Sequence, residues 1–398
     1  MRKAWMPSLL REFGTCSLRS CARSRIRADG AGADANTTPE SMTVPIETLT
    51  TRRTASSNAA STPARPPLLR TVGRGRWLRL YPVALGLGGL GGSWRTAAGL
   101  GAPLWPAMCL VVLCFGAWIT ITALYVVAGG GDPRALIADL RHADQGFAVG
   151  YIPVIPLLLL AQVRAQTSGL RILDLGLVAV WAIVTAALVA HWITTPRDRH
   201  AIHPGLSLPV VAGPFISCIS LQANSWHLLA QGMFAVGVFF WMTFGTVILG
   251  RLMTEQRLPD ARFSTLAALM VPPATASVAW FGLNDNRITT LGTGLAAVLA
   301  MMALIQLFIV PEYLRRPFTV SAWTFSFPLA AAANTVGHWA IAAPLPAVRV
   351  LAWSSLVLAT ATIGLLAVLT VRMLWRTSRA ATTRSGPSPA CDVGALVD

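Results

Sequence analysis

Long apolar runs, separated by short polar breaks, fill the chain after residue 79. Each run is about 18–25 residues long, enough for a helix to cross a ~30 Å hydrocarbon core. The in-and-out alternation that is typical of a membrane barrel is absent. The pattern predicts an all-α integral membrane protein with ten transmembrane helices. The predicted spans are 80–98, 103–128, 145–166, 171–192, 207–224, 226–250, 264–284, 287–309, 318–342 and 346–374.

Prolines alternate between these spans. Odd-numbered spans carry prolines inside or at their start, and even-numbered spans have none in their interiors; the positions are Pro82, Pro153, Pro156, Pro209, Pro214, Pro272, Pro273 and Pro328. Proline kinks a helix, and broken backbone is tolerated at membrane depth where it is buried in protein or lines a watery cavity. We therefore expect five helical hairpins, with kinked odd helices forming an inner ring around a central pore and straight even helices outside. The alternative is that proline is simply commoner in membrane helices.

Glycine is concentrated in the first predicted span, where residues 85–92 read LGLGGLGG. Such a surface lets another helix approach the backbone closely. It equally allows ions to approach the backbone, so close helix packing and pore lining both remain open for this segment.

Charged residues are scarce and unevenly placed. They make up 12% of the chain, against roughly 25% in a soluble domain. The net charge is +16, and fourteen basic residues lie in residues 1–79. A basic tail beside membrane spans indicates topology before it indicates nucleic-acid binding. Arginine is also richer in the alternate loops that lie on the same side as both tails, which predicts that both termini are cytoplasmic.

Three regions follow from this pattern. Residues 1–79 have no sustained apolar period and are expected to be a disordered, basic cytoplasmic tail, with residues 1–41 a start-site artefact if Met42 begins the chain. Residues 80–375 are the channel domain, and residues 376–398 form a second disordered cytoplasmic tail.

The chemistry of coupled pumps is missing from the spans. They contain no glutamate, and Asp174 and Asp285 stand at predicted span ends, so a proton relay is hard to build. His338 is interpreted as a hydrogen-bonded packing residue. No catalytic constellation, nucleotide site or metal-ligand spacing appears, and the six cysteines show no disulfide pattern. We therefore expect no enzyme activity, cofactor or metal, and passive conduction of anions drawn by Arg95 and Arg164 at one mouth.

Four segments resemble one known family. Residues 318–328 read FTVSAWTFSFP, and residues 85–95, 140–145 and 271–279 agree in order and spacing. Together they resemble the tellurite-resistance/dicarboxylate transporter family, which includes plant slow-type anion channels and bacterial tellurite-resistance channel homologues. The chain departs from the family pattern at Ala143, at Ala322 and in its long amino-terminal tail.

The resemblance implies a pore inside each subunit of a homotrimer in the plasma membrane, plugged by a phenylalanine. Phe327 is the matching position, with Phe325 second. The function it implies is an anion channel or uniporter for chloride, nitrate or oxyanions such as tellurite. The alternative is a proton-coupled carrier for malate and related C4-dicarboxylates. A membrane-embedded assembly or sensor subunit without transport is a third class.

Overall fold

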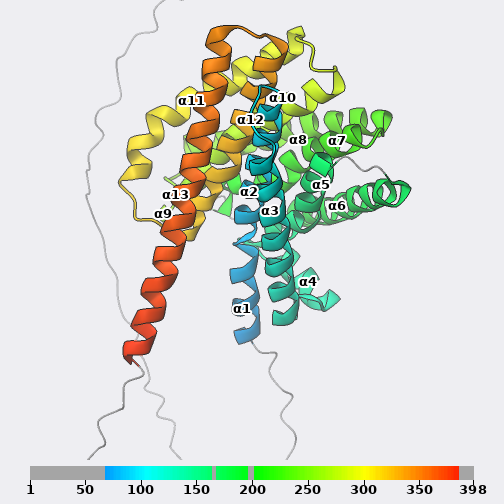
Figure 1. Ribbon diagram of the computed structural model, residues 1–398. Helices are drawn as coiled ribbons and strands as arrows, with labels where there is room; N and C mark the ends of the chain where they lie inside the picture. Colours follow the sequence, from blue (N-terminus) through cyan, green and yellow to red (C-terminus); the bar gives the residue numbers. More distant parts are fainter. Residues whose placement is uncertain (1–67, 164–166, 196–200, 385–398) are drawn as a thin grey trace, which may run out of the picture. The chain divides into compact units, whose positions relative to one another are not determined.

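The computed structural model describes residues 68–163, 167–195 and 201–384, and this part of the chain is helical without strands (Figure 1). The longer helices are α2 (Tyr81–Ala98), α3 (Trp105–Tyr125), α5 (Tyr151–Val163), α6 (Ser168–Thr194), α7 (Gly213–Ala223), α8 (His227–Thr254), α10 (Val271–Leu283), α11 (Thr290–Leu314), α12 (Ser326–Ala342) and α13 (Pro346–Arg384). Three further helices lie between or before them: α1 (Leu68–Leu78), α4 (Pro133–Leu140) and α9 (Asp260–Phe263).

Eight helical segments in the described residues are long and apolar enough to cross a membrane. They are Trp105–Gly130, Gly146–Val163, Ser168–Thr194, Pro204–Ala223, His227–Thr254, Asp260–Leu283, Thr290–Leu314 and Pro346–Arg376. Each coincides with one of the predicted spans to within a few residues at either end. The prediction of an all-helical, multi-pass membrane protein is therefore confirmed for the described part of the chain.

The two remaining predicted spans are helical but are not among these eight segments. Residues 80–98 form α2, and residues 318–342 form the 3₁₀ segment η7 (Val320–Phe325) followed by α12. Glycine dominates α2, while serine, asparagine and histidine interrupt α12, which lowers the mean hydropathy of both helices. The same composition suits helices that lie against other helices rather than against lipid.

Burial alternates along the chain. Three of the eight segments, those containing α5, α7 and α10, are 72% to 83% buried inside the protein. The other five, containing α3, α6, α8, α11 and α13, are only 11% to 22% buried. The apolar side chains exposed on these five helices, such as Val112, Ile183 and Phe308, are suited to contact with lipid.

The buried helices contact one another in a closed order. α2 packs on α5, α5 on α7, α7 on α10, α10 on α12, and α12 returns to α2. We call these five the inner helices. Each inner helix also packs against the next helix in the chain, which gives the outer helices α3, α6, α8, α11 and α13.

Prolines lie where four inner helices change their backbone. Short 3₁₀ or π segments, η2 (Gly146–Gly150), η5 (Leu208–Ala212), η6 (Ser264–Met270) and η7, run directly into α5, α7, α10 and α12. The positions are Pro153 and Pro156 in α5, Pro209 in η5, Pro214 at the start of α7, Pro272 and Pro273 at the start of α10, and Pro328 at the start of α12. Apart from Pro156, which lies inside α5, these prolines fall in a first helical turn, where the missing N–H has no partner to lose.

The ends of the transmembrane domain differ from the expectation. Residues 68–78, placed in a disordered tail, form α1, and α13 continues to Arg384, beyond the predicted boundary at residue 375 (Figure 1). A buried ion pair holds α1: Arg74 Nε lies 3.0 Å from Asp139 Oδ2 of α4, and Tyr125 donates a hydrogen bond to the same oxygen. The remainder of both tails lies outside the described residues.

Candidate functional site: a cavity enclosed by the inner helices

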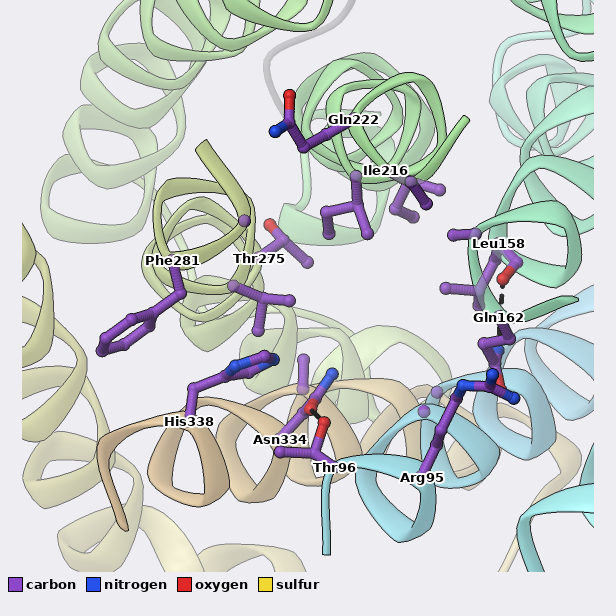
Figure 2. A pocket seen from close by; sticks show the side chains of 18 of the residues that line it. Arg95, Thr96, Leu158, Gln162, Ile216, Gln222, Thr275, Phe281, Asn334 and His338 are labelled. Carbon is purple, nitrogen blue, oxygen red and sulfur yellow. Dashed lines mark hydrogen bonds between the residues drawn. The ribbon is translucent and has the colours of Figure 1, made fainter. Parts of the chain in front are cut away.

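A cavity of about 560 Å³ lies among the five inner helices (Figure 2). Its lining residues come from all of them and from the turn after α10: Gly89, Gly92, Arg95, Thr96 and Gly99; Leu158, Ala161 and Gln162; Ile216, Ile219, Gln222 and Ala223; Thr275, Val278, Phe281, Gly282, Asp285 and Asn286; Phe327, Ala331, Asn334, His338 and Ile341. None of the described outer-helix residues contributes to this wall. The cavity is thus internal to the chain.

The cavity occupies one end of the ring of inner helices. Its lining begins near the middle of α2 at Gly89 and runs to Gly99, just past the end of that helix. On α12 it runs from Phe327 to Ile341 at intervals of three or four residues, which place those residues on one face of a helix. Asp285 and Asn286, in the turn after α10, are exposed, so the cavity reaches solvent at this end. We call it the vestibule.

Phe327 lies at the deep end of the vestibule. Its side chain is 4% exposed and packs with the apolar cluster that includes Leu85, Ile155 and Ile216. The ring sits against Gly89: a Cβ atom added there would lie 2.8 Å from Phe327 Cδ2 and 3.2 Å from Cε2. The glycine of α2 therefore makes room for the phenylalanine of α12 on the deep side of the vestibule.

Phe325, the second candidate, lies elsewhere. Its ring centroid is 4.7 Å from that of Tyr313 on α11, in an edge-to-face arrangement, and it is not among the residues that line the vestibule. Phe325 and Phe327 are two positions apart, and α12 begins between them at Ser326. The Phe327 side chain therefore lines the vestibule, whereas the Phe325 side chain packs on an outer helix.

The two mouth arginines have different outcomes. Arg95 is in the last turn of α2 and lines the vestibule, extending beside Gln162 of α5 (Figure 2). A cation at the carboxyl end of a helix is favoured by the helix dipole. Arg164 lies outside the described residues, so its place at the mouth stays a prediction. Of the described lining residues, Arg95 and Asp285 are those with charged side chains.

Polar side chains that the sequence did not single out form one wall of the vestibule. Thr96 Oγ1 of α2 donates to Asn334 Oδ1 of α12 at 2.6 Å. Gln162 Nε2 donates to the carbonyl oxygens of Gly88 and Leu158, while its Oε1 atom is buried with no partner among the described residues. The α12 part of this wall could have been predicted from the sequence. Intervals of three and four residues place Phe327, Ala331, Asn334 and His338 on one helical face.

His338 combines two roles. The sequence interpretation was a hydrogen-bonded packing residue, and the ring does stack on Phe281, with centroids 5.5 Å apart and planes at 13°. Its Nδ1 atom lies 2.7 Å from Asn286 Oδ1. The same side chain also lines the vestibule. The packing interpretation was therefore incomplete.

Asp174 is a correction to the sequence analysis, which placed it at a span end, out of reach of the interior. It lies inside α6 and is fully buried. Ser220 Oγ donates to Asp174 Oδ1 at 2.6 Å and Asn224 Nδ2 donates to Oδ2 at 3.0 Å, both from α7 and its C-terminal cap. A buried carboxylate is costly unless it is hydrogen-bonded in this way. It joins α6 to α7 and does not line the vestibule.

Broken, buried helices around an internal cavity, with apolar helices outside them, define a multi-pass membrane protein of the channel and transporter class. Residues 78–371 match the SLAC1 family, described as voltage-dependent anion channel, and the chain belongs to this family. The resemblance found in the sequence is thereby confirmed.

Three relatives give the comparison more detail. The chain is 28% identical over 181 residues to the tellurite resistance protein TehA homolog of Haemophilus influenzae, a match covering 44% of this chain and 53% of that protein. It is 24% identical over 214 residues to the guard cell S-type anion channel SLAC1 of Arabidopsis thaliana, covering 50% and 37%. It is 22% identical over 295 residues to the S-type anion channel SLAH4 of the same plant, covering 71% and 79%.

Proposed function

We propose that the protein conducts small anions passively, through the vestibule and past Phe327. The observation that carries the proposal is the vestibule itself: it is enclosed by five buried helices, has Arg95 on its wall and ends on one aromatic ring. An apolar ring in a narrow passage opposes ions by excluding water. A rotamer change costing on the order of 1 kcal/mol is enough to move such a ring. Opening is therefore within reach of a modest signal.

The proposed architecture is ten transmembrane helices in five hairpins, with α2 and α12 as the two further spans. Its support is the closed order of contacts among the inner helices and the pairing of each with the following outer helix. The proline-containing inner helices surround the pore and the outer helices face lipid. Contrary to the expectation of straight outer helices without interior prolines, α11 contains Pro311 and α3 continues into a kink at Gly129. We further propose a homotrimer in the plasma membrane with both termini cytoplasmic, by resemblance to the family and from the arginine distribution.

The proposed substrates are chloride, nitrate and oxyanions such as tellurite. Two of the relatives are named as anion channels and a third as a tellurite resistance protein. The test is efflux of chloride from liposomes that hold the purified protein, with no pH gradient and with the membrane potential clamped. Efflux down the gradient supports a passive pathway, whereas absence of flux under every gradient favours a subunit without transport.

The alternative is a proton-coupled carrier for C4-dicarboxylates such as malate. Two observations favour keeping it: the buried carboxylate of Asp174 and the presence of a titratable side chain, His338, in the vestibule. Malate flux measured with and without a pH gradient separates the two functions. Uphill malate accumulation driven by protons would replace the channel proposal with the carrier.

Neutralising the mouth charge is expected to lower conductance most at low salt. Arg95→Gln and Arg164→Gln together remove the positive charge that raises the local anion concentration, and salt screens such charge over ~8 Å at physiological ionic strength. Conductance of the double variant measured at low and high chloride tests this. An unchanged low-salt conductance would mean that the two arginines only reach toward lipid headgroups.

The topology predicts that Arg287, after the turn that follows α10, faces away from the cytoplasm. A cysteine introduced there, in a chain whose own cysteines are replaced, is expected to react with a membrane-impermeant reagent added outside intact cells. A cysteine replacing Arg315, beyond the end of α11, is the opposite control. Labelling of position 287 from the cytoplasmic side alone contradicts the topology.

A further inference from the structure

The wall of the vestibule formed by α12 presents a hydrogen-bond donor of fixed orientation. Asn334 Oδ1 accepts the Thr96 hydroxyl at 2.6 Å, which leaves the other half of the amide, its NH₂ group, facing the cavity (Figure 2). No hydrogen bond joins this NH₂ group to another of the described residues. An amide NH₂ group carries two donors and no acceptor, so the partner it suits is an anion or a water molecule.

His338 follows Asn334 by one helical turn and points into the same space (Figure 2). Its Nδ1 atom faces Asn286 Oδ1 at 2.7 Å. A carbonyl oxygen can only accept, so Nδ1 carries the proton and Nε2 is the nitrogen that gains a second one. The stacked ring of Phe281 holds the imidazole plane. Neutral His338 therefore offers no donor from Nε2, while protonated His338 offers both an N–H donor and a positive charge.

The groups around His338 set the effect of that proton. Arg95 of α2 and Asp285 of the turn after α10 line the same vestibule, and α5 and α7 contribute the neutral amides of Gln162 and Gln222. His227 lies behind Gln222, with its Nδ1 atom 2.9 Å from Gln222 Oε1. Arg287 follows Asn286 and is exposed. The charges of Arg95 and Asp285 cancel among the described lining residues, so protonation of His338 makes the wall net positive.

We propose that Asn334 and His338 form a proton-dependent anion subsite inside the vestibule, positioned by Thr96 and Asn286. The ligand is a small inorganic anion, chloride or nitrate. Its affinity rises when His338 takes a proton from the solution at the open end of the vestibule. By linkage, a bound anion favours protonation of His338 by the same factor. The inference rests on the proposed function, because it supplies the regulation of that pathway.

The experiment uses the full chain in liposomes, as wild type and as Phe327→Ala, with chloride efflux measured between about pH 4 and about pH 8, so that the range extends below the usual titration of histidine. Efflux is expected to rise several-fold on acidification. His338→Gln, neutral at every pH, is expected to abolish the rise. His227→Gln, which removes the other histidine at this end of the inner helices, is expected to keep it. Asn334→Leu is expected to lower efflux throughout the range. A rise that survives in His338→Gln, or efflux without pH dependence in the wild type, overturns the subsite.

Binding is read separately from transport. Carbon-labelled histidine spectra of the purified protein, titrated with acid in nitrate and in gluconate, report the protonation of each imidazole. The His338 signal, assigned by its loss in His338→Gln, is expected to titrate at higher pH in nitrate than in gluconate. An identical titration in both salts overturns the subsite even if chloride flows. A nitrate-dependent titration without flux in any variant keeps the subsite and contradicts the proposed conduction.

Discussion

Phe327→Ala is expected to raise anion conductance several-fold in a protein that still folds. The ring lies at the deep end of the vestibule against Gly89, directly before Pro328. In the proposed pathway, its removal takes away the apolar ring that opposes anion passage beyond the vestibule. Single-channel recording of purified wild type and variant in planar bilayers measures the effect. Phe325→Ala removes a ring of the same kind that packs on Tyr313, and it is the matched control without an expected gain.

A packing role for Phe327 gives the opposite result. In that case the truncation leaves a cavity that costs roughly 3–5 kcal/mol by the experience of soluble cores, so yield and melting temperature fall while conductance does not rise. A well-folded Phe327→Ala protein with wild-type or lower conductance would remove this residue from the pathway.

Gly89→Ala is expected to destabilise the protein, and Phe327→Ala is expected to relieve the loss. The added Cβ atom would lie 2.8 Å from Phe327 Cδ2 and 3.2 Å from Ala330 Cβ. Overpacking of this kind costs about 1–3 kcal/mol. Contacting residues couple in a double-mutant cycle, so melting temperatures of wild type, both single variants and the double variant measure the contact. Gly116→Ala on α3, where nothing lies within 4 Å, is the control with no expected loss.

Additive losses in that cycle would show that Phe327 does not rest on Gly89 in the folded protein. Such a result would also leave open the two interpretations that the sequence allowed for residues 85–92. Coupling instead assigns Gly89 to the close approach between α2 and α12.

The irregular backbone of the inner helices could be predicted from the positions of their prolines. Pro272 and Pro328 lack an N–H, so the backbone at their positions is restricted by the sequence itself, and both lie in the first turn of an α-helix that follows a 3₁₀ segment. The helix ends were predicted less accurately: α11 reaches Leu314, whereas the hydrophobic run predicted an end at residue 309. Amphipathic side chains near the end of a span fit both inside the membrane and at its surface, so they do not indicate where the helix ends.

Contacts between distant residues could not be predicted. Arg74 and Asp139 are 65 positions apart, and their buried pair converts the end of an apparently featureless tail into α1. Asp174 is buried because Ser220 and Asn224 of another helix supply its donors. No local pattern marks such partners, since a single polar residue near a span end looks the same whether it meets water or a neighbouring helix.

Within the vestibule, the sequence identified single residues better than it identified the wall. Arg95, predicted as positive charge at one mouth of a pore, is among the residues that line the vestibule. The resemblance ranked Phe327 before Phe325, whereas the residue pattern alone does not separate them, because the start of α12 at Ser326 decides which ring lines the vestibule. Asn334 and His338 acquire their orientation from Thr96 and Asn286, which lie on other elements.

The reversal potential of the current through the purified protein tests the central claim most directly. With chloride at different concentrations on the two sides of a planar bilayer and the same pH on both, a passive anion pathway predicts a current that reverses near the chloride equilibrium potential. Replacing chloride by gluconate on one side should shift that reversal accordingly. A current that ignores the chloride gradient and follows an imposed pH gradient would contradict passive anion conduction.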